Sequence, residues 1–268
     1  MVFLQKYITG YLAHYIHSLW FLRLPQNAAA HEERIIPDGH LEMVIHLHRD
    51  KAKRLQQNAC WQAEPQHLFL GQNTKSYYLK LEPGAELYGI RFRPEALPIF
   101  YDIAAHHLTD TIVSLDIIPG AKEIIRLADQ DTDVTFESLT TYFSALLNKS
   151  NPANPKFLLA RYAINKINRS LGQIKIDSLS SEMNISTKYL EEVFRFHVGI
   201  TPKIYSTLVQ LQYFIRYRNH HPLKTLTECS YEAGFYDQAH LIRTFTRYTE
   251  MNPHQYFKNP NQINNYFI

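Results

Sequence analysis

The pattern of apolar and polar positions changes midway along the chain. Before residue 148, short runs rich in β-branched and aromatic residues stand between turn signals. We predict strands at HLEMVIHLH (40–48) after the turn PDG, at SYYLKL (76–81) before EPG, and at ELYGIRFR (86–93) before proline. Segments 121–130 and 136–148 instead carry apolar residues at helical spacing. The pattern predicts a β-rich domain with a helical tail over residues 1–147.

A different period follows the segment NKSNPANPK, which is polar, contains two prolines and is predicted as a linker over 148–156. Beyond it, apolar residues recur with the 3.6-residue period of helices, and the breaks fall at glycine, asparagine and proline. The predicted helices are 156–171, 176–183, 186–198, 202–219, 224–233 and 237–248. We therefore expect an α+β protein of two domains, with an all-α domain at 157–258 and a tail at 259–268.

One unit occurs twice in the helical half. Both IDSLSSEMNISTKYLEEVFRFHVGITPKIY and LKTLTECSYEAGFYDQAHLIRTFTRYTEMNPHQYF give a short helix, a tight turn, a longer helix, and then a proline and a tyrosine. A short helix, tight turn and longer second helix form a helix-turn-helix, whose second helix enters the major groove of DNA. One such match arises easily by chance, whereas two in tandem are much rarer.

The two longer helices can be divided into inner and outer faces at 100° per residue. Ser186 and Asp237 are predicted to cap them. Apolar residues form the inner faces, and the outer and flanking positions are Thr187, Lys188, Glu191, Glu192 and Arg195 in the first helix, and Gln238, Ala239, His240, Arg243 and Arg247 in the second. Arginine and glutamine read guanine and adenine edges with paired hydrogen bonds, and alanine contacts the thymine methyl group.

Charge is distributed unequally between the halves. Residues 1–150 carry a net charge of −3 and residues 151–268 carry +6, so the helical half suits a polyanionic partner. Two cysteines, Cys60 and Cys229, exclude a disulfide scaffold and suit a reducing cytoplasm. Charged residues and histidines interrupt the apolar amino terminus, so we expect neither a membrane span nor a signal peptide.

The segment GFYDQAHLIRTFTRYTEMNPHQYF resembles the motif of the AraC/XylS transcriptional regulators, and the earlier unit resembles that family's first helix-turn-helix, over roughly residues 157–257. The resemblance implies double-stranded DNA as the partner. It also implies base-facing positions at Lys188, Glu191 and Glu192 in the first helix and at Gln238, Ala239 and Arg243 in the second. The segments ERIIPDGHLEMVIHL, LGQNT and GIRFRPEALPIF resemble the cupin-like sensor domain of some of these regulators; the ligand is not implied.

The chain departs from this family in three ways. Ser180 and Ser230 stand where a small alanine is usual, which is tolerable if each hydroxyl bonds back to its own helix. Glu191 and Glu192 place acids on the first reading face, where they repel phosphate. Positions commonly basic in the family hold Gln210 and Tyr213. We expect the second helix to contribute more to DNA binding than the first.

Two clusters in the amino-terminal half are weaker candidates for chemistry. His46 and His48 share a strand face, as cupin metal ligands do, but no third histidine is suitably spaced, so no metal is predicted. Arg91 and Arg93 also share a face and are candidates for binding an anionic effector; the simpler interpretation is a salt bridge to Glu82 or Glu86. No nucleophile motif, Walker loop or glycine fingerprint occurs, so we predict neither an enzyme nor a cofactor.

The sequence thus predicts a cytoplasmic, sequence-specific DNA-binding regulator whose front domain senses an effector or forms a homodimer. RNA polymerase is a further candidate partner. Two other classes stay open: a cupin-like metal protein or enzyme with a helical appendage, and a protein-interaction adaptor that has lost DNA binding.

Overall fold

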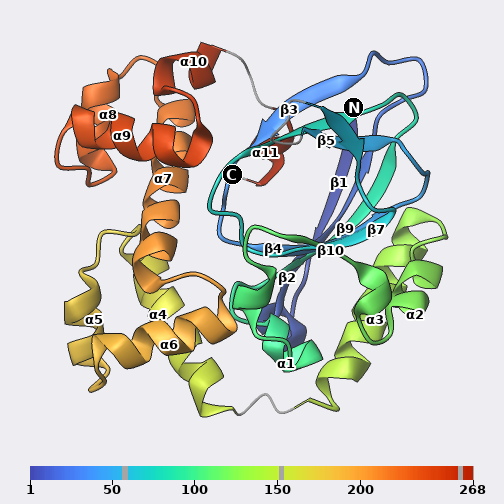
Figure 1. The fold of residues 1–268 in the computed structure, drawn as a ribbon, viewed down its shortest axis with the longest axis horizontal. Helices are drawn as coiled ribbons and strands as arrows, with labels where there is room; N and C mark the ends of the chain where they lie inside the picture. Colours follow the sequence, from blue (N-terminus) through green and yellow to red (C-terminus); the bar gives the residue numbers. More distant parts are fainter. Residues whose placement is uncertain (56–59, 151–153, 259–261, 268) are drawn as a thin grey trace.

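The computed structural model describes residues 1–55, 60–150, 154–258 and 262–267. Figure 1 shows a body of two β-sheets on one side of the molecule and a body of helices on the other. The amino-terminal half is β-rich and the carboxy-terminal half is helical, as the sequence predicts, and the chain forms two domains of the α+β class. Among the described helices, none is long and apolar enough to cross a membrane.

The strands form two antiparallel sheets. They are β1 (Val2–Tyr7), β2 (Ile16–Arg23), β3 (His31–Ile35), β4 (Leu41–His46), β5 (Ala52–Leu55), β6 (Trp61–Ala63), β7 (His67–Leu70), β8 (Tyr77–Leu81), β9 (Glu86–Phe92) and β10 (Ile112–Ser114). The six-stranded sheet has the order β1-β2-β9-β4-β7-β10, and the four-stranded sheet has the order β3-β8-β5-β6. The three predicted strands are confirmed as β4, β8 and β9. The other strands were not predicted.

The six-stranded sheet is buried on both faces. Leu19 and Ile90 lie in a core with helices, whereas Trp20 and Leu87 lie in a second core between the sheets. Strands covered on both sides lose the apolar-polar alternation of a half-exposed strand, as β2 does. Gly89 is required here, because a Cβ at this position would lie 1.9 Å from the Trp20 ring.

The helices agree with all eight that the sequence predicts. They are α1 (Leu97–Tyr101), α2 (Ala121–Leu127), α3 (Thr132–Leu147), α4 (Pro155–Arg169), α5 (Ile176–Glu182), α6 (Thr187–His197), α7 (Pro202–His220), α8 (Leu226–Glu232), α9 (Gln238–Thr249), α10 (Pro253–Lys258) and α11 (Gln262–Phe267). Short 3-10 turns are η1 (Tyr11–His14), η2 (Ala105–Leu108) and η3 (Leu115–Ile117). Helices α1, α10 and α11 were not predicted.

The segment predicted as a linker is partly helical. Asn154 caps α4, and its side chain accepts a hydrogen bond from the Lys156 amide at 2.9 Å, so the helix begins within 148–156. Residues 151–153 of that prediction lie outside the described residues. Part of the predicted tail, 259–261 and 268, also lies outside them, while the remainder forms α11.

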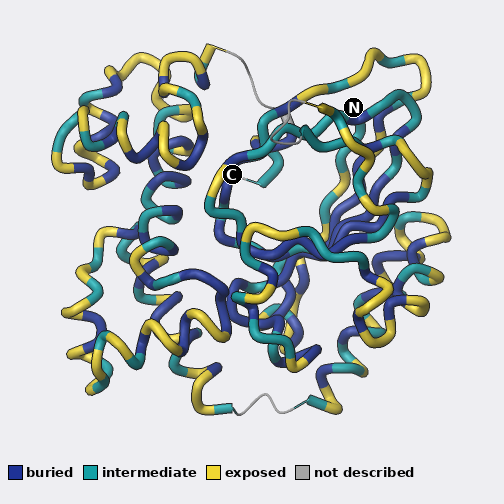
Figure 2. Tube along the Cα trace, viewed as in Figure 1, coloured by how far each residue is buried: buried dark blue, intermediate teal, exposed yellow. Residues whose placement is uncertain are grey.

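Apolar cores cross the boundary between the two domains. Figure 2 shows buried segments running from the sheets into the adjacent helices. Phe157 of α4 belongs to the core of the β-rich domain, and Ile36 after β3 belongs to the core of the helical domain. Ile263 of α11 packs into the core between the sheets. The helical domain is therefore packed against the β-rich domain through shared apolar side chains.

Candidate nucleic-acid interface

Each helix-turn-helix unit is built around the same turn. In the first unit, Asn184 has a φ of 54°, and the Ile185 amide donates to the Ser180 carbonyl at 3.1 Å. In the second, Gly234 has a φ of 75°, and the Phe235 amide donates to the Ser230 carbonyl at 2.9 Å. A left-handed residue of this kind ends a helix, and glycine and asparagine adopt it with least strain. The turn thus reverses the chain identically in α5-α6 and α8-α9.

The two unusual serines fit inside the units. Ser180 and Ser230 are almost fully buried. Their hydroxyls donate to main-chain carbonyls in the same helix, to Asp177 at 3.0 Å and to Thr227 at 2.8 Å. The predicted return of each hydroxyl to its own helix is confirmed, and it satisfies a polar group that burial would otherwise penalise.

Both candidate reading helices begin at the predicted caps. The Ser186 side chain accepts from the Tyr189 amide at 3.1 Å, and the Asp237 carboxylate accepts from the His240 amide at 2.6 Å. These bonds satisfy amides that have no partner within a helix. Buried apolar residues hold the inner faces against the domain: Leu190, Val193 and Phe194 in α6, and Leu241, Phe245 and Tyr248 in α9.

The outer face of α6 carries mixed charge. Lys188, Glu191, Glu192 and Arg195 are all exposed there. Thr187 is placed differently, because it is half-buried and its hydroxyl donates to an Asp177 carboxylate oxygen at 3.1 Å. Thr187 therefore ties α6 to α5, while the other predicted positions are accessible from outside.

The outer face of α9 is cationic. Ala239, Arg243 and Arg247 are exposed, and no ion pair within the described residues involves either arginine. Gln238 is half-buried, and its side-chain oxygen accepts from the Thr227 hydroxyl at 2.8 Å, which leaves the amide nitrogen available. His240 is also half-buried, with its ring 5.5 Å from that of Phe235. Of these five predicted residues, His240 is the one most engaged in packing.

A hollow of about 460 Å³ lies beside the second unit and was not predicted. Its walls include Arg218, Lys224 and Lys258, together with Gln238 of α9. The N-terminus of α8 also lies here, where Thr225 and Glu228 form a capping box. The excess of basic residues after 150 was the only sequence signal for these cations, since they come from three separate elements.

Arg91 lies in β9 and Arg93 directly after it, and both have different partners from those expected. Arg91 is only 3% exposed; it pairs with Asp38 and donates to Glu42 at 2.6 Å. The Arg93 Nε donates to the Ala13 carbonyl at 3.0 Å. The predicted salt bridges to Glu82 and Glu86 were wrong, because Glu82 pairs with Lys53 and Glu86 with Arg23. Register explains the difference: Glu42 of β4 lies directly across from Arg91.

Burial and charge shift the pKa values around Arg91. Burial raises the pKa of Glu42 above its ordinary value, although Arg91 opposes the rise. Burial acts in the same direction on Asp38 and is the largest single influence there, but the charges of Arg91 and His40 and the hydrogen bonds from both residues together lower the pKa. Burial and the neighbouring guanidinium lower the pKa of His17 to about 4 and of His40 to about 3. Both imidazoles are therefore neutral near pH 7.

A cavity of about 520 Å³ separates the β-rich domain from α4 and α7. Four arginines line it, and the carboxylates among its walls are Asp38 and Glu95. The arginines are Arg91, Arg93, Arg161 and Arg216. Since His17 and His40 in the same wall are neutral, the lining carries excess positive charge and suits an anionic group. The structure thus brings Arg91 and Arg93 together in one cavity with cations from the helical domain.

The candidate metal ligands do not form a cluster. His46 is 3% exposed, and its Nε2 lies 3.4 Å from a Glu64 oxygen. The His48 Nε2 lies 3.4 Å from a Glu86 oxygen. Across the described parts of the chain, no group of three or more histidine, cysteine, aspartate or glutamate side chains is placed to hold a metal ion.

Two family models match the chain. A helix-turn-helix domain matches residues 179–259, and a domain of unknown function (DUF6597) matches residues 9–114. None of the curated proteins matches.

Several solved structures resemble the fold at low sequence identity. ToxT from Vibrio cholerae in its P21 form is 10% identical, covers 89% of this chain and 98% of its own, and has a TM-score of 0.45. ToxT from Vibrio cholerae O395 is 12% identical, with 96% and 97% covered and a TM-score of 0.46. The AraC-like transcriptional activator CuxR is 12% identical, with 86% and 90% covered and a TM-score of 0.29. The chain therefore carries a helix-turn-helix domain in its carboxy-terminal half, behind a DUF6597 domain.

Proposed function

We propose that α6 and α9 each enter a major groove, and that sequence is read mainly by α9. Arg243 carries this proposal, since it is exposed and has no ion-pair partner among the described residues. It lies one helical turn after Ala239 on a helix that is capped at Asp237 and fixed by a buried inner face. Arginine reads guanine through two hydrogen bonds, and alanine contacts thymine, so the pair supplies base contacts on one face. The side-chain oxygen of Gln238 is bonded to Thr227, so its amide nitrogen adds a donor at the start of the helix.

The first reading helix has the weaker role in this proposal. Glu191 and Glu192 are exposed on its outer face, where phosphate repels them. Glutamate also accepts a hydrogen bond from cytosine N4, so the same two side chains give α6 selectivity at the expense of affinity. Lys188 and Arg195 provide the compensating positive charge.

Phosphate contacts come from cations outside the reading faces. Lys224, Arg218 and Lys258 line the hollow beside α8 and α9, close to the capped start of α8. Contacts to phosphate fix the position of a protein on the duplex and carry no sequence information. In this proposal the basic hollow sets the register and Arg243 reads the base.

The front domain acts as the sensor of an anionic small molecule. Arg91 and Arg93 face the cavity between the domains, and Arg161 and Arg216 approach it from α4 and α7. A ligand there touches both domains and thereby biases DNA binding. Contact with RNA polymerase, pairing with a second copy and a place in the cytoplasm stay predictions. Regulators of this type are typically not enzymes.

Selection of bound fragments from random genomic DNA, at low and moderate salt, tests this function. The full-length protein is expected to enrich fragments that share a motif, with affinity falling steeply as salt rises. Enrichment of no motif with a flat salt dependence would favour the adaptor that has lost DNA binding. Metal analysis of the purified protein tests the cupin-like alternative, which predicts stoichiometric metal.

A further inference from the structure

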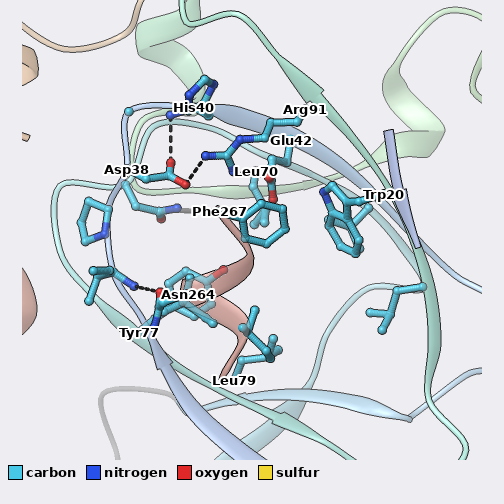
Figure 3. A pocket seen from close by; sticks show the side chains of 18 of the residues that line it. Trp20, Asp38, His40, Glu42, Leu70, Tyr77, Leu79, Arg91, Asn264 and Phe267 are labelled. Atoms are coloured by element: carbon cyan, nitrogen blue, oxygen red, sulfur yellow. Dashed lines mark hydrogen bonds and ion pairs between the residues drawn. The ribbon is translucent and has the colours of Figure 1, made fainter. Parts of the chain in front are cut away.

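Helix α11 lies against the β-rich domain, next to β3 and away from the helix-turn-helix units that precede it (Figure 1). It contacts β3, the edge strand of the four-stranded sheet. Figure 3 shows Asn264 and Phe267 of this helix among the side chains of the pocket between the sheets, near Arg91 and Trp20. The segment that the sequence presents as a tail is thus inside the candidate sensor domain.

Glu33 of β3 receives the first turn of α11. Its carboxylate accepts from the Ile263 amide at 2.7 Å, from the Asn264 amide at 2.9 Å and from the Asn264 side chain at 3.0 Å. Glu33 is 4% exposed, and a buried carboxylate is costly unless donors surround it. Apart from His31 at 2.9 Å, its side-chain partners in the described residues belong to α11. The β-rich domain therefore holds a charge whose hydrogen bonds depend on this helix.

Asn264 pairs with the free edge of β3. Its side-chain oxygen accepts from the Ile36 amide at 3.1 Å, and its side-chain nitrogen donates to the Arg34 carbonyl at 2.7 Å. These two bonds reproduce what a neighbouring strand provides to an edge, where unpaired main-chain groups otherwise face outward. Asn264 is 5% exposed, so this pairing is part of the interior.

Apolar contacts complete the docking. Ile263 is buried in the core between the sheets. The Phe267 ring lies 5.6 Å from the Trp20 ring, and the Arg91 guanidinium carbon lies 4.7 Å from the Phe267 ring centre. Phe267 forms part of the walls of both the pocket between the sheets and the cavity between the domains. The helix thus occupies space next to the cations that an anionic ligand would approach.

We propose that α11 is an intramolecular ligand of the β-rich domain, and that it competes with small apolar anions for the pocket. The occupant is the chain's own segment 262–267. Glu33 accepts hydrogen bonds from the main-chain amides of this segment, and the edge of β3 pairs with the Asn264 side chain. The apolar part of such an anion takes the place of Phe267, and its charged group lies in the arginine-lined cavity between the domains, which Phe267 also lines. Occupancy by α11 is independent of DNA binding; only its regulatory consequence rests on the proposed sensing role.

The regulatory consequence passes through Arg34. The carbonyl of this residue accepts from Asn264 of α11, and its guanidinium donates to the Thr249 carbonyl at the end of α9 at 2.9 Å. It also pairs with Glu250 at 2.9 Å. Displacement of α11 therefore removes the bond from Asn264 to the same residue whose guanidinium holds the end of α9. Arg34 therefore couples ligand binding in the pocket to the hydrogen bond that holds the end of α9.

Titration with 8-anilinonaphthalene-1-sulfonate, an apolar anion that fluoresces when bound, tests the competition in the full-length chain. The double variant Asn264→Ala/Phe267→Ala removes the edge pairing and the ring. It should bind the probe about tenfold more tightly than the parent, since the apparent affinity rises with the fraction of open pocket. Asn265→Ala, an exposed position of the same helix, should match the parent. Equal affinity for the parent and the double variant would overturn the proposal.

A synthetic peptide of residues 259–268 separates an open pocket from a loosened fold. Added to the double variant, it should displace the probe, whereas the peptide carrying both alanines should not. The single variant Asn264→Ala, which keeps the apolar contacts, should tighten probe binding about threefold and respond to the same peptide. Tight probe binding that the natural peptide does not reduce means general loosening, and the proposal then fails. Because no DNA is present, failure of DNA binding leaves this outcome unaffected.

Discussion

Arg34 of the β-rich domain donates a hydrogen bond of 2.9 Å to the main-chain carbonyl of Thr249, the last residue of α9. The Ser76 hydroxyl donates to the same carbonyl at 2.9 Å, and the Ser76 amide donates to the Tyr248 carbonyl at 2.9 Å. A guanidinium at this position also interacts favourably with the negative end of the helix dipole. The carboxy-terminal end of α9 is therefore bound to the β-rich domain.

Helix α6 is held by the same domain. The His106 Nδ1 lies 3.3 Å from the Arg195 carbonyl in the last turn of α6. Just beyond that helix, the Thr109 hydroxyl donates to the Gly199 carbonyl at 2.7 Å. The contacts of the β-rich domain with α6 and with α9 both lie at the carboxy-terminal ends of these helices, and they leave the outer faces exposed. In this arrangement the β-rich domain fixes how α6 and α9 are placed relative to each other without covering them.

Loss of the hydrogen bonds from Arg34 and Ser76 to the end of α9 should weaken binding to DNA that carries both half-sites. The variant Arg34→Ala/Ser76→Ala leaves the outer face of α9 intact but lets α9 move relative to α6. Binding of both helices then costs more conformational entropy. We expect about a fivefold loss on the complete site and no change on a fragment carrying the α9 half-site alone, as preorganisation predicts. Fluorescence anisotropy with both fragments measures this. Equal losses on the two fragments would mean that the variant damages α9 itself.

Replacement of Arg243 by alanine should remove one base contact. We expect a cost of about 1–3 kcal/mol in binding and relaxed preference at one base pair. The measurement is a binding comparison on a set of operators with single substitutions. Arg126→Ala, an exposed change on α2, serves as the matched control. A uniform loss on every operator would show that Arg243 contacts phosphate.

The sequence predicts the helix-turn-helix units well because their determinants are local. Ser186 and Asp237 cap amides three residues away, and the turns at Asn184 and Gly234 need only one left-handed residue each. Strands β4 and β9 are likewise found from the turn signals beside them. Strand β2 escapes prediction because Leu19 and Trp20 are buried on opposite faces, which removes the alternation.

The partners of Arg91 and of α11 depend on long-range placement. Glu42 and Arg91 are 49 residues apart in the sequence, and only the register of β4 and β9 brings them into contact. Glu33 meets Asn264 across 231 residues, and nothing near either residue indicates the other. A short segment such as 262–267 is read as a tail, since its helix exists through packing and not through intrinsic propensity.

Neutralising the acids on α6 should tighten DNA binding. Glu191→Gln/Glu192→Gln removes two negative charges from an exposed face that lies toward phosphate in the proposed complex. We expect about a tenfold gain in affinity at low salt, with a smaller gain at high salt because screening weakens the repulsion. If either glutamate accepts from cytosine, preference at that base pair is lost at the same time. Unchanged affinity at low salt would place α6 away from DNA.

Lys224 should contribute to affinity without affecting specificity. Lys224→Ala removes one cation from the hollow beside α8, so the slope of log affinity against log salt should fall by about 1. The expected loss is the same on all operators. Lys122→Ala on α2, outside the hollow, is the control and should leave the slope unchanged. A change in base preference would instead assign Lys224 to base reading.

Acid should destabilise the chain through the two histidines of the cavity between the domains. Burial, then the neighbouring arginines, lower the pKa of His17 to about 4, and burial and Arg91 lower that of His40 to about 3, while Asp38 opposes both shifts. Unfolded histidine has a pKa of about 6.5, so below pH 6.5 the unfolded chain binds protons that the folded chain does not. The contribution of each ring to stability is complete above pH 6.5 and is lost as the pH falls towards the folded value.

Urea unfolding at intervals between pH 7.5 and 4.5 measures that loss. Each ring contributes at most about 1.4 kcal/mol per pH unit within its window. Glu42 and Glu95 have raised pKa values and act in the opposite direction, so the histidine contribution is taken as a difference between variants. His40→Asn does not titrate, and its amide nitrogen can replace the ring nitrogen that lies 3.0 Å from the Phe92 carbonyl. The variant should lose less stability than the parent on acidification, and parallel curves for the two proteins would show that His40 titrates freely in the folded chain.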